Sequence, residues 1–159
     1  MLAGLSQSLA GWSSYYGNHQ ALSVTIRYVH FAALLVGGGT AIALDRQVLR
    51  LHRAAPGVRD ATFTMLNAAH AVVIVSLVLI VMSGLLMAAA DVDTYVASAT
   101  FWTKMGLVAL LIVNGAVLAR AGRGGAAIAS RRRLAIASGL SIALWLIIVY
   151  VSNWLVVAP

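Results

Sequence analysis

Four side chains that can carry a charge fall inside long apolar stretches of this sequence. They are Arg27, His30, His70 and Lys104. Ionisable groups in hydrocarbon are costly and usually functional, so these four are the first candidates for a site. An imidazole can bind the iron of a b-type haem, and a guanidinium or ammonium can pair with a haem propionate, a quinone oxygen or a lipid phosphate. Both cations can instead extend to the headgroups without a specific partner.

Several other chemistries are missing from the sequence. The chain has 0 cysteines, which excludes disulfides, thiolate metal sites and thiol nucleophiles. It also has no glycine-rich phosphate loop, no Gly-x-Ser-x-Gly motif and no His-Glu-x-x-His motif. No acid falls within the apolar stretches, so we expect neither a proton-carrying carboxylate nor a cation site inside a membrane. No motif assigns an enzymatic activity.

The composition predicts a membrane protein, because 62% of the 159 residues are hydrophobic and only 9% are charged. Soluble domains carry about 25% charged residues. Four apolar stretches are each long enough to cross ~30 Å of hydrocarbon as a helix. They cover residues 21–44, 62–90, 97–119 and 134–157. The sequence therefore predicts an all-α fold, a single integral membrane four-helix bundle over residues 1–159.

The arginines predict how this bundle is oriented. Nine of them gather in the segments that follow the first and third stretches, namely Arg46, Arg50, Arg53, Arg59, Arg120, Arg123, Arg131, Arg132 and Arg133. Basic loops stay in the cytoplasm, so we expect a multi-pass protein of the cell (inner) membrane with both termini non-cytoplasmic. Anionic lipids are the expected partners of these loops. The same rule accounts for the net charge of +7, so no nucleic-acid partner is expected.

The N-terminal segment has its own pattern. Apolar and aromatic residues recur at helical spacing between residues 2 and 16, with serines and a glutamine between them. This spacing predicts a short helix lying on the outer interface. The alternative is a frayed polar terminus.

Depth along the spans divides the polar residues into two levels. The outer level holds Arg27, His30, Lys104 and Asn153. His70 and Asn114 fall inside the midplane. We estimate an offset of ~13 Å between His30 and His70 at ~1.5 Å per residue, which disfavours one haem bridging this pair within one chain. Each histidine can also be a hydrogen-bonded structural residue.

Small residues line one face of the first span. Ala33, Gly37 and Thr40 share a helical stripe with His30, and residues 37–39 are all glycine. Missing side chains allow close approach of a flat ligand or of another helix. Tight helix packing alone is the alternative explanation of this face.

Two stretches resemble a known group of proteins. Residues 27–31 read RYVHF and precede the glycines and Arg46, and residues 101–108 read FWTKMGLV before a leucine-rich run and Asn114-Gly115. This resembles the small four-helix membrane proteins grouped around the copper-resistance D domain and the HemJ-type protoporphyrinogen oxidase. The resemblance implies a four-helix bundle and, in the oxidase branch, a b-type haem with electron transfer toward quinone. His30 would be the first-helix histidine and Lys104 the third-helix lysine.

Three functions follow as hypotheses. The first is electron transfer with a b-type haem or a quinone, in which His30, Arg27, Lys104, His70 and Asn114 are the candidate cofactor-binding residues. His30 is the first candidate iron ligand and His70 the second. The second hypothesis is a non-catalytic membrane subunit or anchor that binds a partner membrane protein or a second copy of itself. The third is a permease for a small solute or metal.

Overall fold

The computed structural model describes the backbone of residues 2–51, 59–123 and 128–157. Side chains are described along these segments, except those of residues 51–70 and several near the helix ends. The described elements are all helices: α1 (Leu2–Asn18), α2 (Gln20–Leu51), α3 (Arg59–Ala90), α4 (Val92–Ala97), α5 (Ala99–Arg123) and α6 (Ile128–Val157). The predicted all-α fold is confirmed.

Four of these helices are long and apolar enough to cross a membrane. The candidate spans are Gln20–Arg50, Ala71–Ala90, Ala99–Leu118 and Arg132–Leu155. They correspond to the four stretches expected from the sequence, although α2 continues well past the expected end at residue 44. Asp45 therefore belongs to the first candidate span, contrary to the expectation that the spans contain no acid.

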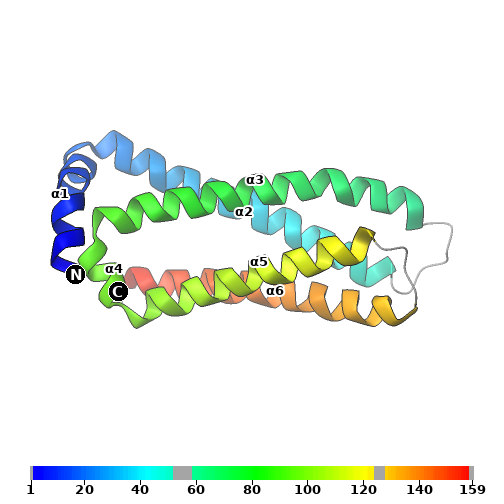
Figure 1. Cartoon of the computed structure of the whole chain (residues 1–159). Helices are drawn as coiled ribbons and strands as arrows, with labels where there is room; N and C mark the ends of the chain where they lie inside the picture. Colours follow the sequence, from blue (N-terminus) through cyan, green and yellow to red (C-terminus); the bar gives the residue numbers. More distant parts are fainter. Residues whose placement is uncertain (1, 52–58, 124–127, 158–159) are drawn as a thin grey trace.

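The long helices lie side by side, and the two ends of the chain meet at the same end of the bundle (Figure 1). Helix α1 lies across that end, where it contacts α2, α3 and α4. The Trp12 indole nitrogen donates to the Leu86 carbonyl at 2.9 Å. The Ser6 hydroxyl donates to Asp93 at 2.9 Å. The N-terminal residues thus form a helix fixed to the end of α3 and to α4.

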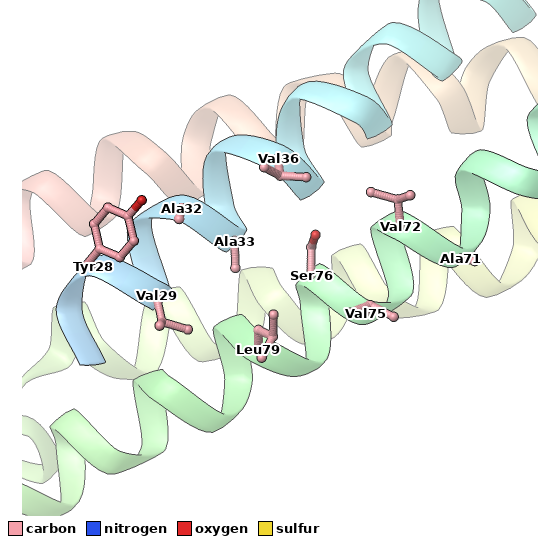
Figure 2. A pocket seen from close by; sticks show the side chains of 10 residues that line it. All are labelled: Tyr28, Val29, Ala32, Ala33, Val36, Ala71, Val72, Val75, Ser76 and Leu79. Carbon is pink, nitrogen blue, oxygen red and sulfur yellow. The ribbon is translucent and has the colours of Figure 1, made fainter. Parts of the chain in front are cut away.

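Helices α2 and α3 pack closely because one of them lacks a side chain at the contact. A Cβ on Gly37 would lie 2.5 Å from the Ser76 Cβ. On the outer side of this pair runs a groove of about 560 Å³, with Ala33 and Val36 on one wall and Val72 and Val75 on the other (Figure 2).

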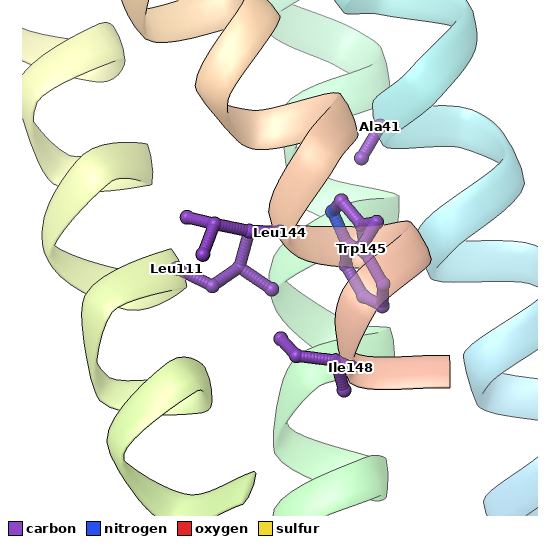
Figure 3. Packing of buried hydrophobic residues seen from close by; sticks show 5 residues of the cluster. All are labelled: Ala41, Leu111, Leu144, Trp145 and Ile148. Atoms are coloured by element: carbon purple, nitrogen blue, oxygen red, sulfur yellow. The ribbon is translucent and has the colours of Figure 1, made fainter. Parts of the chain in front are cut away.

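Helix α6 packs against both α2 and α5. Trp145, Leu144 and Ile148 of α6 pack with Ala41 of α2 and Leu111 of α5 (Figure 3). The α2–α6 contact again uses a glycine, since a Cβ on Gly38 would lie 3.0 Å from the Trp145 ring. Of the three α2 glycines at positions 37–39, only Gly38 lies against an aromatic ring of α6.

The outer surface of the bundle is apolar. Leu35 is 75% exposed, Phe31 65% and Leu146 60%. Large apolar side chains exposed over every long helix are what a hydrocarbon solvent requires.

We predict that Gly37→Ala destabilises the bundle, whereas Gly39→Ala does not. The new Cβ at position 37 meets the Cβ of Ser76, which cannot move by a side-chain rotation, whereas a Cβ at position 39 meets nothing within 4 Å. Overpacking of this kind costs about 1–3 kcal/mol. Thermal or denaturant unfolding in detergent, followed by tryptophan fluorescence, measures the difference. Equal stability of the two variants would contradict the close α2–α3 contact.

Candidate functional site

His30 is the best-positioned candidate of the outer level. It lies on α2, is 7% exposed, and its Nδ1 is 2.9 Å from the Ser83 hydroxyl of α3. A Cβ on Gly84 would lie 3.3 Å from the His30 Cε1. The absence of a side chain at Gly84 therefore leaves room for the imidazole against α3.

The hydrogen bonds around Ser83 determine which imidazole nitrogen carries the proton. The Ser83 hydroxyl donates to the Leu79 carbonyl and also lies 3.2 Å from the Ile80 carbonyl. Its single hydrogen is thus used within α3, so its oxygen accepts from His30. With Nδ1 as the donor to Ser83, the neutral imidazole has its lone pair on Nε2.

The charge of Lys104 reaches this imidazole. Lys104 is a half-buried residue of α5. Asn153, expected at the same level, is exposed and donates to the Val149 carbonyl of its own helix at 3.0 Å. Asn153 is thus directed to its own backbone and not to the other outer-level residues.

Arg27 belongs to a separate group at the α1 end of the bundle. Its Nε donates to the phenolic oxygen of the buried Tyr16 at 3.4 Å, and its charge also acts on Tyr95 of α4. The guanidinium itself is exposed. Only one of its nitrogen atoms is used in this bond, so the guanidinium keeps donors for an anionic group.

Asn114 has a structural partner at the other end of the bundle. It is 7% exposed, and its Nδ2 donates to the Ala137 carbonyl at 2.8 Å, which joins α5 to α6. This bond explains why a buried amide is tolerated there.

His70 is far from His30 along the bundle. Its side chain lies outside the described residues, but its backbone is part of α3. Ser83 marks the level of His30, and His70 precedes Ser83 by 13 residues. At ~1.5 Å per residue this places the two histidines ~20 Å apart along the helix axis. The offset between the two histidines has the direction estimated from the sequence, and at ~20 Å it is larger than the estimate of ~13 Å.

Ser83 and Asp45 are among the buried polar residues that were not singled out from the sequence. Ser83 orients His30, and Asp45 is 6% exposed inside α2. A serine in an apolar helix carries no distinctive signal, because its hydroxyl ordinarily bonds to its own helix. Asp45 lies one residue beyond the expected span, so a boundary error removed it from consideration.

No group of three or more potential metal ligands occurs among the described residues. Comparison with protein-family models, curated proteins and solved structures finds no match for this chain.

The pKa of the Tyr95 phenol depends on the charged groups around Arg27. Burial raises the pKa of the Tyr95 phenol, the Asp91 carboxylate and the Tyr16 phenol raise it further, and Arg27 opposes them. We predict that Asp91→Asn lowers this pKa and that Arg27→Gln raises it. Tyrosinate absorbance during alkaline titration measures the change, with the same variant carrying Tyr95→Phe as the reference.

The same shift predicts a pH dependence of stability. The unfolded chain begins to lose the Tyr95 proton at about pH 10, where the folded chain still retains it. Stability contributed by this group is therefore present below about pH 10 and is lost as the pH rises through the higher folded pKa. In Asp91→Asn we expect a smaller loss of stability as the pH rises above about 10. An unchanged loss of stability would contradict the role of Asp91 in raising the Tyr95 pKa.

Proposed function

We propose that this chain is a multi-pass membrane protein that takes part in electron transfer through a b-type haem or a quinone bound beside His30. The observation that carries this proposal is the hydrogen-bond chain from His30 through Ser83 to the Leu79 carbonyl. Metal-binding histidines are oriented in this way, because a second hydrogen bond fixes the tautomer and the ring plane. It leaves Nε2 as the atom that binds iron or accepts a proton from a quinol.

The two cations suit the same ligands. Lys104 acts on His30, and Arg27 keeps guanidinium donors on the exposed end of the bundle. Haem propionates and quinone oxygens are both acceptors that pair with such donors. A haem would supply one-electron chemistry at its iron when bound, and the chain would orient it and hold its charges.

Of the two candidate histidines, His30 alone would hold such a haem, because the ~20 Å along α3 is too long for His30 and His70 to bind one iron. Any second iron ligand would come from another chain. A haem shared between two copies would make this protein a homo-oligomer.

A specific observation also favours a second function, that of a non-catalytic subunit or anchor. The groove between α2 and α3 is apolar, and the small residues Ala32 and Ala33 are part of its lining (Figure 2). Small residues let another membrane helix approach closely. A partner helix in this groove would require neither a cofactor nor His30.

The orientation proposed for the bundle places its basic end in the cytoplasm. Arg46 and Arg50 end α2, Arg120 and Arg123 end α5, and α1 lies at the opposite end (Figure 1). Because the positive-inside rule concerns the basic residues near span ends, both termini would be non-cytoplasmic.

Single cysteines test this orientation cleanly, because the chain has 0 of its own. We expect Ser13→Cys on α1 to react with a membrane-impermeant maleimide in intact cells. Arg50→Cys should react only after permeabilisation. Both side chains are exposed in the described structure. The reverse pattern would invert the proposed topology.

The electron-transfer proposal is tested by absorption spectra of the purified protein, oxidised and dithionite-reduced, together with extraction of bound quinone. In the haem form, a Soret band and reduced α and β peaks should appear near one haem per one or two chains and disappear in His30→Ala. Ser83→Ala should weaken haem binding by about 10–100-fold, since it removes the orienting bond.

His19→Ala is the matched control, because His19 is exposed and bonds to the Tyr15 carbonyl of its own segment. Its spectrum should equal that of the wild type. A wild-type protein with neither chromophore nor quinone, after expression with ample haem, would contradict electron transfer and favour the subunit function.

A further inference from the structure

Helix α1 contacts α2 one turn beyond His30. The Arg27 Nε donates to the hydroxyl of the buried Tyr16 of α1, and Arg27 precedes His30 by three residues on α2. Positions three residues apart share one face of a helix and differ by ~4.5 Å in height. Tyr16 therefore meets α2 just beyond His30, in the direction of the α1 end of the bundle (Figure 1).

The same helix contacts α3 one turn beyond Ser83, the residue that bonds to His30. The Trp12 indole donates to the Leu86 carbonyl at 2.9 Å, and Leu86 follows Ser83 by three residues. Because α3 runs toward the α1 end, this contact has the same level as the contact of Tyr16 with α2 (Figure 1). The Trp12 and Tyr16 rings, with centroids 5.9 Å apart, thus extend from α3 to α2 beyond the His30–Ser83 bond.

Few interactions hold α1 to the bundle. Tyr16 is its only buried side chain among those described, and the bonds from Trp12 to Leu86 and from Ser6 to Asp93 are both exposed. Segments with few buried contacts and exposed hydrogen bonds open at a lower free energy than the rest of a structure. Helix α1 can therefore detach while the packing of α2 against α3 and α6 is kept.

A break in the helical backbone separates α1 from α2. Helix α1 ends at Asn18 and α2 begins at Gln20, so His19 alone lies between them. A Cβ on Gly17 would meet nothing within 4 Å, so this position is not packed against the bundle. Glycine adopts many backbone conformations, and residues at the ends of elements absorb the dihedral change of a hinge. Residues 17–19 can therefore act as a hinge without a change in α2.

We propose that α1 is a lid, hinged at residues 17–19, that closes the approach to His30 from the α1 end of the bundle. In the closed form the Trp12 and Tyr16 rings cover this approach, and His30 is 7% exposed. In the open form a small water-soluble molecule reaches the imidazole. The lid controls access to His30 whatever the imidazole binds, so its test requires neither a haem nor a quinone.

The rate at which diethyl pyrocarbonate labels His30 measures the opening, because this reagent modifies accessible imidazoles. Trypsin cleaves after Arg27 and Arg46, and the peptide between them contains His30 and no other histidine. Mass spectrometry of the full chain, labelled in detergent and free of haem, therefore reads His30 separately. The exposed His19 is the internal reference for the reagent. In the wild type we expect slow labelling of His30 and fast labelling of His19.

A disulfide between α1 and α4 tests the lid directly, because it keeps α1 closed. The Ser6 hydroxyl and the Asp93 carboxylate are 2.9 Å apart, and the chain has 0 cysteines, so Ser6→Cys with Asp93→Cys places one pair of thiols at this contact. The reduced pair should label His30 faster than the wild type does, since it lacks the Ser6–Asp93 bond. Oxidation should abolish this labelling and leave that of His19 unchanged.

Trp12→Ala tests the lid from the side of α3. It should raise the labelling rate of His30 about tenfold, because it removes a hydrogen bond and an aromatic contact from the closed form. Trp154→Ala is the matched control, because Trp154 is 57% exposed and belongs to α6. Its labelling rate should equal that of the wild type.

Several results would overturn the proposal. One is equal labelling of His30 in the oxidised and reduced thiol pair, and another is an unchanged rate in Trp12→Ala. Labelling of His30 as fast as that of His19 in the wild type would contradict the cover by α1. Failure of the two thiols to form a disulfide would contradict the contact of α1 with α4. If Trp12→Ala fails to fold, the comparison of the oxidised and reduced pair decides the question.

Discussion

Two adjacent glycines determine how helix α2 meets its neighbours. Gly37 lets α2 contact Ser76 of α3, and Gly38 lets it contact the Trp145 ring of α6. Each contact sets the register of a helix pair, and two pairs of buried polar residues lie at fixed distances along the helices from these contacts. His30 and Ser83 lie about two turns from the first contact, in the direction of α1. Asp45 and Ser138 lie about two turns from the second, toward the basic end.

This arrangement inverts the usual distribution of polarity. The buried residues include a histidine, an aspartate, an asparagine and several serines, whereas leucine, valine and phenylalanine side chains are exposed on the outside. Lipid tails are as apolar as leucine, so burial of leucine between helices gains little, and small residues and hydrogen bonds determine which helices pair. The His30–Ser83 and Asn114–Ala137 bonds illustrate this, because each joins two different helices.

The sequence was sufficient to predict the number of candidate spans, because this number depends only on the length and order of the apolar stretches. The separation of His30 from His70 along the helices follows from the same order. The hydrogen-bond partners of the polar side chains could not be predicted from depth. A helix that is apolar on all sides has no periodic pattern to fix its rotation, so neither the bond to Ser83 nor the turn of Asn153 to its own helix could be derived.

Asp45 was missed for a different reason. Hydropathy finds where an apolar stretch ends, but a helix continues until its backbone bonds end, and α2 extends to Leu51. Asp45 is buried in these last turns even though its own segment is no longer apolar. Span boundaries taken from hydropathy therefore conceal the charged groups that lie at the ends of a bundle.

The attachment of α1 has a consequence for how the protein is made. Trp12 and Ser6 emerge early from the ribosome, yet their partners, the Leu86 carbonyl and Asp93, come about 75 to 90 residues later in the chain. Helix α1 cannot take its final position until α3 and α4 have been synthesised. Closure of this end is therefore a late event of cotranslational assembly, and until then the ends of α2 and α3 that α1 later contacts stay accessible to other molecules.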